Sequence, residues 1–251
     1  MYQQLLKIQL LVNTDDFYPE EHYKLIANAQ NIQIEPYSTS TLRKFYLLNV
    51  TPVAGNYLLQ GGDEIQIDIQ FYNRHHDDFH YSDLITMRLY DTKRSNNKSW
   101  TLEGTITNES TYHQGVIEVY NHWQMGKPLN WHNLPPEIAT LEYISACLKY
   151  TGINAVTPEK TVFEIDFRLI KSELDIACAF AEAFFGARSY MGRYLDTLDD
   201  CILSLYHKRG YFEDKTIVLK NTQHSLTDEV RKVLPELQQI LDGYKFQVIE
   251  Q

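Results

Sequence analysis

The feature that most constrains the fold is a change of periodicity along the chain. Four segments in the first half alternate apolar and polar side chains: Leu6–Val12, Ile65–Phe71, Leu84–Tyr90 and Val116–Tyr120. Alternation with a period of two puts one set of side chains on a core face and the other in solvent, which favours antiparallel strands. Turn-forming residues separate the segments at Gly61–Asp63, Ser95–Lys98 and Asn108–Ser110. The first part of the chain is therefore predicted to be β-rich and mainly antiparallel.

After residue 160, short apolar strands alternate with helices. The predicted strands are Thr161–Phe167, Thr216–Leu219 and Lys245–Ile249. The predicted helices run from a cap at Ser172 to a break near Gly186, from just after Gly192 to about Tyr206, and over Leu226–Asp242. This order predicts an α/β domain with a small three-stranded parallel sheet, and an α+β fold class overall.

The boundary between the two parts is predicted to follow a helix. Apolar Ile138, Leu141, Ile144 and Leu148 have helical spacing, Pro136 suits a first helical turn, and Gly152 suits a stop. The polar stretch Thr151–Lys160 then resembles a linker. We therefore predict a β-rich domain over residues 1–153 that ends in this helix, and an α/β domain over residues 160–251.

Composition excludes several classes of function. A length of 251 residues favours two domains, and no apolar run is long enough to cross a membrane. A net charge of −10 argues against direct binding of nucleic acid, because phosphates would be repelled. Three isolated cysteines and an N-terminus without the features of a secretory signal predict a cytoplasmic protein.

One segment resembles a known family. The stretch Tyr190-Met-Gly-Arg-Tyr-Leu-Asp-Thr-Leu-Asp-Asp200 is similar to the barstar family's aromatic-aromatic-Gly-x-Asn-Leu-Asp-x-Leu-x-Asp motif. Six positions match in register without a gap: Tyr190, Gly192, Leu195, Asp196, Leu198 and Asp200. The order of predicted elements also matches, and the resemblance covers roughly residues 161–251. It implies a barstar-like domain, and with it an intracellular inhibitor of ribonucleases, often an immunity protein against a toxin.

The chain also departs from the family pattern. Met191 replaces the second aromatic residue, Tyr194 replaces the usual Asn, and Asp199 replaces a position that is aromatic in the best-known inhibitor. The acidic residue that the family offers from its last helix aligns near Gln238 or Gln239. Pro235 is expected to kink or split that helix. These departures indicate a partner other than the family's best-studied nuclease.

The acidic residues of the motif have a physical logic of their own. Asp196 and Asp200 are four residues apart, so they share one helix face, and Asp199 flanks them. Such carboxylates can occupy the phosphate positions of a ribonuclease active site, whose Arg and Lys side chains would meet them. Tyr190 and Tyr194 would supply rigid aromatic anchors. The predicted partner-binding residues are Tyr190, Gly192, Tyr194, Leu195, Asp196, Asp199 and Asp200. The alternative is that Asp196 complements the helix N-terminus while the other two are only solvated.

Other candidate sites have simpler interpretations. Arg74–His80 carries ligand-type side chains but lacks a metal-binding spacing, so a polar loop is favoured. Gly61-Gly-Asp-Glu64 is interpreted as a hairpin turn. His122–Trp123 and Trp131–His132 could line a sugar or base pocket, or belong to the core. No catalytic motif has a credible context, so no catalytic residue, cofactor or metal is predicted.

Three hypotheses about function follow. The favoured one is a non-enzymatic inhibitor or immunity protein that blocks the active site of a basic ribonuclease or nuclease toxin. The alternative is a non-enzymatic binding or regulatory protein that reuses the barstar-like fold for another partner. The third is an enzyme whose site lies in the N-terminal half.

Overall fold

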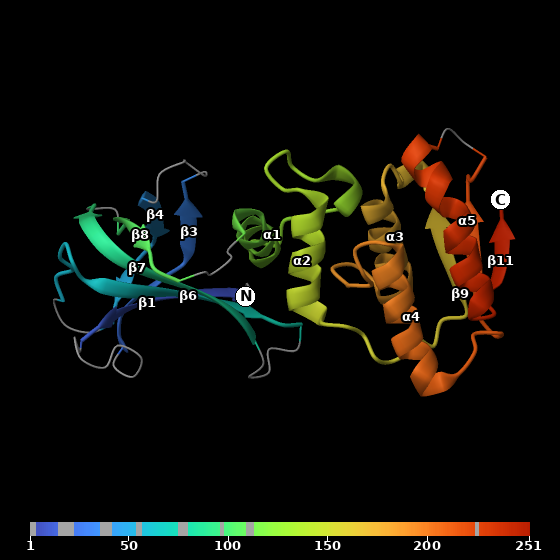
Figure 1. The fold of residues 1–251 in the computed structure, drawn as a ribbon, viewed down its shortest axis with the longest axis horizontal. Helices are drawn as coiled ribbons and strands as arrows, with labels where there is room; N and C mark the ends of the chain where they lie inside the picture. The colour runs from blue at the N-terminus through green and yellow to red at the C-terminus, as the bar shows by residue number, and fades with distance from the viewer. Residues whose placement is uncertain are drawn as a thin grey trace. The chain divides into compact units, whose positions relative to one another are not determined.

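The computed structural model describes residues 4–14, 23–35, 42–53, 57–74, 80–95, 98–108, 113–223 and 226–251. The chain forms two compact units, Met1–Pro128 and Leu129–Gln251 (Figure 1). Within the described residues, no helix is both long and apolar enough to span a lipid bilayer.

The first unit is built on antiparallel strands. They are β1 (Leu6–Asn13), β2 (Tyr23–Ala29), β3 (Asn31–Ile34), β4 (Leu42–Leu48), β5 (Thr51–Pro52), β6 (Glu64–Tyr72), β7 (His80–Arg94) and β8 (Trp100–Ile106). The strands pair in the order β3-β4-β8-β7-β6-β1-β2-β5, and every pairing is antiparallel. The predicted β-rich, antiparallel first domain is confirmed.

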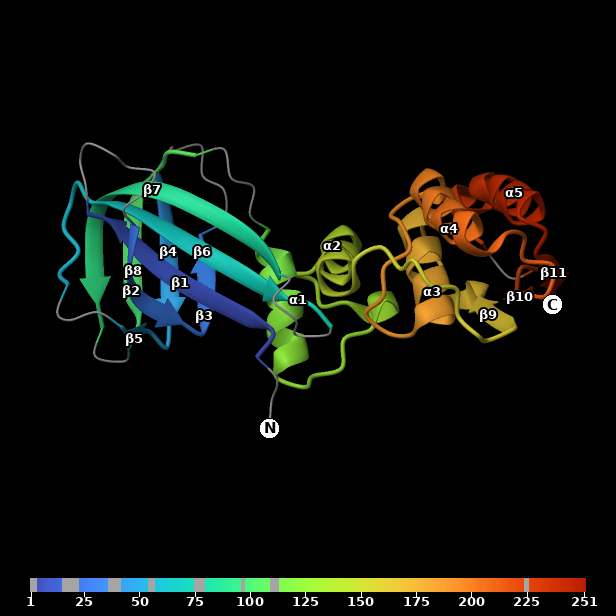
Figure 2. The ribbon, with the colours of Figure 1, turned by 90° about the horizontal axis from the view of Figure 1, so that it is seen from below.

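This sheet closes on itself. The outermost pairings in the order, β3 with β4 and β2 with β5, are made by the same two segments of chain. Only Gln30 separates β2 from β3, and only Asn49 and Val50 separate β4 from β5. The pairing of the two segments keeps one register throughout, with Asn28 opposite Thr51 and Asn31 opposite Leu48. Strand β2, which pairs with β1 near one end of the order, therefore continues into β3, which pairs with β4 at the other end (Figure 2).

Helix α1 (Gln114–Gln124) belongs to the same unit and contacts β1 and β3. The prediction of a strand over residues 116–120 was therefore wrong. Val116, Tyr120 and Trp123 recur at helical spacing and are all buried, and the Tyr120 ring lies 5.0 Å from that of Phe71. Packing of this stripe against the sheet outweighs the strand preference of the β-branched residues.

The second unit combines helices with a parallel sheet. Its elements are η1 (Trp131–Asn133), α2 (Thr140–Thr151), β9 (Val162–Asp166), η2 (Phe167–Leu169), α3 (Glu173–Phe185), α4 (Leu195–Arg209), β10 (Thr216–Lys220), α5 (Asp228–Gly243) and β11 (Gln247–Glu250). The sheet order is β11-β10-β9, and both pairings are parallel. The predicted three-stranded parallel sheet and the α+β class are confirmed.

Helix α3 begins and ends at the capping residues that the sequence indicates. The Ser172 hydroxyl accepts a hydrogen bond from the Asp175 backbone, and the Asp175 carboxylate accepts one from the Ser172 backbone at 3.0 Å. This reciprocal cap starts α3, and Gly186 ends it. Stacked rings, with Phe163 4.0 Å from Phe184, fill the space between α3 and β9.

Two helices differ from their predicted form. Helix α2 begins at Thr140, because Pro136 lies in a turn closed by the Ile138 backbone N–H and the Pro135 carbonyl. Helix α5 runs through Pro235 as one element rather than splitting. Pro235 is exposed, so water can reach the Arg231 carbonyl that proline leaves without a helical donor.

The division between the compact units also differs from the predicted boundary. It falls at Pro128–Leu129, so α2 and residues 152–160 belong to the second unit. In α2 the buried side chains include Tyr143, Ile144 and Cys147, whereas Leu141 of the predicted apolar stripe is 38% exposed. The Trp131 indole donates to Glu182 of α3 at 2.7 Å, which fixes η1 to the α/β part of the unit.

Candidate partner-binding face on helix α4

The loop before α4 depends on a glycine. Gly192 has a φ of +94°, and a Cβ there would lie 2.5 Å from the backbone nitrogen of Leu198 and 2.6 Å from the carbonyl carbon of Thr197. Only glycine fits both the left-handed backbone and the close approach of the helix. Gly192 therefore positions α4, and its place in the motif has a packing explanation.

The first turn of α4 is held by side chains. The Thr197 hydroxyl accepts hydrogen bonds from the backbone of Arg193 at 2.8 Å and of Tyr194 at 3.0 Å. The Glu173 carboxylate, at the start of α3, accepts from the Leu195 backbone at 2.7 Å. These contacts satisfy donors that a helix N-terminus otherwise leaves open, so the face that follows has a fixed backbone.

Carboxylates gather on the outer face of α4. Asp196 and Asp200 are exposed one turn apart, and Asp199 between them is half-buried. Within the described part of the chain, none of the three forms an ion pair. Arg193 could have neutralised Asp196, but its guanidinium donates to the Ser145 hydroxyl of α2 at 3.3 Å.

Asp199 connects α4 to α5. The Tyr244 side chain at the end of α5 lies beside the Asp199 carboxylate. Burial and this nearby negative charge raise the pKa of Tyr244 above its usual value. The Tyr244 ring lies 5.7 Å from that of Tyr206, which lies 5.1 Å from that of Tyr211. Sequence spacing gave no signal for Tyr244, because its position depends on how α5 packs against α4.

Three of the predicted residues are not available to a partner. Leu195 is 2% exposed, Gly192 is buried, and Tyr190 is 9% exposed. The Tyr190 carbonyl accepts a hydrogen bond from the Asn154 side chain at 3.4 Å, and burial raises the pKa of Tyr190. Tyr194, at 45% exposure, is the predicted aromatic residue that solvent reaches. The structure thus brings together Tyr194, Asp196, Asp199 and Asp200 on the surface, with the other three beneath.

The last helix offers no carboxylate at the aligned position. Gln238 donates a hydrogen bond to Glu250 of β11, and Gln239 is exposed. Burial and the nearby Asp200 raise the pKa of Cys201 to about 11, so this thiol inside α4 is protonated at neutral pH.

The remaining sequence candidates are structural where they are described. Gly62 has a φ of +99° in a turn, where its backbone N–H bonds to the Leu89 carbonyl at 2.8 Å. Trp123 and Trp131 are buried. Residues 75–79 of the Arg74–His80 segment lie outside the described residues. Among those described, no group of three or more His, Cys, Asp or Glu side chains is arranged to hold a metal ion.

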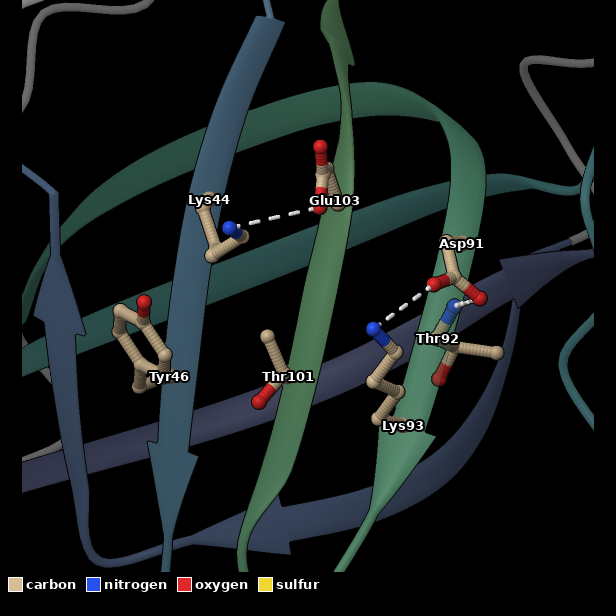
Figure 3. Close-up of a pocket in the computed structure, with 7 residues that line it drawn as sticks. All are labelled: Lys44, Tyr46, Asp91, Thr92, Lys93, Thr101 and Glu103. Atoms are coloured by element: carbon tan, nitrogen blue, oxygen red, sulfur yellow. Dashed lines mark hydrogen bonds and ion pairs between the residues drawn. The ribbon is translucent and has the colours of Figure 1, made fainter.

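A small pocket of about 130 Å³ lies over β4, β7 and β8 (Figure 3). Its charged groups neutralise one another: Lys44 lies 3.5 Å from Glu103, and Lys93 lies 3.5 Å from Asp91. The Tyr46 hydroxyl, also at this pocket, donates to Glu35 at 2.7 Å. Its charged groups are thus satisfied by cross-strand and same-strand pairs, as on an ordinary solvent-facing sheet.

No protein-family model matches this chain, and neither a curated protein nor a solved structure is significantly similar to it.

Proposed function

We propose that this protein inhibits a partner ribonuclease, without catalysis of its own, by placing the exposed face of α4 in the partner's active-site cleft. The observation that carries the proposal is the pair Asp196 and Asp200. Both carboxylates are exposed, one turn apart, and without an ion pair among the described residues. Like charges at this spacing repel, so a cationic partner would relieve an existing cost.

The chemistry of a ribonuclease cleft supports this choice of partner. Its Arg and Lys side chains normally hold phosphate groups, and a carboxylate can accept the same charge-assisted hydrogen bonds. The barstar-like motif and element order point in the same direction. Tyr194 beside Asp196 offers a rigid aromatic contact of the type enriched at interfaces.

In this proposal, the protein acts in the cytoplasm as an immunity protein. Cys147, Cys178 and Cys201 are all free thiols, and such thiols persist in a reducing compartment. The net charge of −10 suits a basic protein partner and disfavours direct contact with RNA.

One observation favours the alternative, a binding or regulatory protein for a different partner. Tyr190, Gly192 and Leu195 of the motif are buried, so packing alone can account for part of the resemblance. The partner's identity then separates the two proposals.

The test uses the full chain as bait in a lysate of the source organism, followed by an RNA-cleavage assay. The proposal requires the captured protein to cleave RNA alone and to lose that activity when one equivalent of inhibitor is added. A captured partner without ribonuclease activity would favour the alternative. A captured ribonuclease that stays active in the complex would overturn inhibition through the active site.

A further inference from the structure

The outer surface of the closed sheet carries a second, larger pocket that the proposed inhibition does not use. It has a volume of about 450 Å³ and is lined mainly by Lys7, Asn28, Gln30, Asn49, Thr51 and Tyr72. This volume falls within the range of about 300–1,000 Å³ that is typical of small-molecule sites. The lining is polar, so a polar ligand is the kind it can take.

Strand register brings these residues together. Asn28 of β2 lies opposite Gln9 of β1 and opposite Thr51 of β5. Lys7, Gln30 and Asn49 line the same pocket, next to the paired positions Ile8 with Ala29 and Asn31 with Leu48. Polar side chains of β1, β2 and the β4–β5 segment thus gather at one place on the surface of the sheet.

The amide groups beside the pocket are already oriented. The Gln70 side chain donates to Gln9 at 3.0 Å, and Gln9 donates to the Asn28 side-chain oxygen at 3.4 Å. This chain of bonds occupies the Asn28 oxygen. In the described part of the chain, the Asn28 amide nitrogen has no acceptor, so it remains available to donate.

Lys7 gives the pocket an uncompensated positive charge. It is half-buried, it forms no ion pair among the described residues, and none of the described lining residues is acidic. Lys44 and Lys93 in the pocket of Figure 3 each lie 3.5 Å from a carboxylate. In a chain with a net charge of −10, a cation left without a carboxylate partner suits an anionic ligand.

The hydrogen-bonding groups narrow the class of anion. Side-chain amides both donate and accept, as sugar hydroxyls do, whereas phosphate oxygens only accept. A single lysine balances one carboxylate. The Tyr72 ring adds an apolar surface of the kind that can pack against a sugar ring.

We propose that this pocket binds an acidic sugar, whose carboxylate pairs with Lys7 and whose hydroxyls bond to Asn28, Gln30 and Asn49. This inference concerns the first unit and is independent of the function proposed for α4.

The test is an NMR titration of the full chain with glucuronic acid, glucose and inorganic phosphate. Glucuronic acid should shift the backbone signals of Lys7, Gln30 and Asn49 saturably, with an affinity about fivefold above that of glucose. Lys7→Gln should remove this preference without weakening glucose binding. Asn28→Ala should weaken both sugars.

The control is Lys93→Gln, which changes a lysine of the same unit outside the pocket and should leave both affinities unchanged. Thermal melts check that each variant is folded. The proposal is overturned if glucuronic acid gives no saturable shifts. So does phosphate affinity equal to that of glucuronic acid, which would make the pocket a general anion site, or an undiminished preference for glucuronic acid in Lys7→Gln.

Discussion

The side chain of Tyr244, at the end of α5, lies beside the carboxylate of Asp199 in the middle of α4. The face proposed to bind a ribonuclease is therefore supported by a second helix. Tyr244→Phe removes only the hydroxyl beside Asp199, and it should lower the free energy of unfolding by at most about 1 kcal/mol, measured by urea denaturation.

The pH dependence of the same variant tests the raised pKa of Tyr244. The pKa of Tyr244 is raised in the folded protein. Wild type therefore loses stability as the pH rises above the unfolded value of about 10, whereas phenylalanine does not ionise. The difference between wild type and Tyr244→Phe should shrink between pH 9 and about pH 11. A difference that stays constant over this range would contradict a raised pKa for Tyr244.

Gly192 and Gly210 form a matched pair for testing the loop before α4. Both have a left-handed backbone, with φ of +94° and +86°, but a Cβ at Gly210 would meet nothing within 4 Å. Gly210→Ala should cost only backbone strain, about 1–3 kcal/mol. Gly192→Ala adds overlap with the backbone of Thr197 and Leu198, and should cost about 1–3 kcal/mol more. Equal losses of stability in thermal or urea unfolding would mean that the close approach is unimportant.

Lys215 fastens the segment before β9. Its side chain is 5% exposed, and its ammonium group donates to the carbonyls of Pro158 at 3.0 Å and Lys160 at 2.9 Å. Lys215→Met leaves these carbonyls without their donor and should lower stability by about 2–3 kcal/mol. It should also speed proteolytic cleavage at residues 154–160.

The control for this change is Lys220→Met. Lys220 is 35% exposed and pairs with Glu164 at 2.8 Å, so its loss should cost less than about 1 kcal/mol. Similar cleavage rates in the two variants would argue that Lys215 does not hold the segment.

The domain boundary predicts different behaviour for two fragments. The sequence predicts that residues 161–251 fold alone, whereas the compact unit begins at Leu129. Residues 129–251 retain the bonds from Trp131 to Glu182 and from Arg193 to Ser145, so this fragment should melt at a higher temperature. Equal melting temperatures would restore the boundary predicted from sequence.

Much of the fold could be predicted because local signals agreed with packing. The alternation in β1 and β6, the cap at Ser172 and the stop at Gly186 each depend on near neighbours in sequence. Residues 116–120 alternate as a strand would, but packing with residues outside this window makes them helical. Trp123, beyond that window, completes a buried helical stripe. Closure of the sheet depends on pairings between distant segments, which a short pattern does not contain.

The candidate site could be predicted only in part. Helical spacing correctly indicated that Asp196 and Asp200 share a face, since both are exposed on one helix. It could not indicate that Tyr190 is buried, because burial depends on segments that are distant in sequence, such as the one with Asn154, whose side chain bonds to the Tyr190 carbonyl. For the same reason, sequence spacing could not indicate Tyr244, because its proximity to Asp199 depends on the packing of α5 on α4.

The most direct test of the proposed function is the affinity of Asp196→Asn and Asp200→Asn for the captured ribonuclease, at low and physiological salt. Asp228→Asn is the control, because Asp228 is an exposed carboxylate on α5 that already pairs with Arg231 at 3.1 Å. We predict that Asp200→Asn and Asp196→Asn each weaken binding by at least about 30-fold, since removing one partner of a buried charge pair commonly costs about 2–5 kcal/mol. Asp228→Asn should bind as wild type does. Affinities within about fivefold of wild type for both α4 variants would be those of solvated carboxylates, and would exclude this face from the interface.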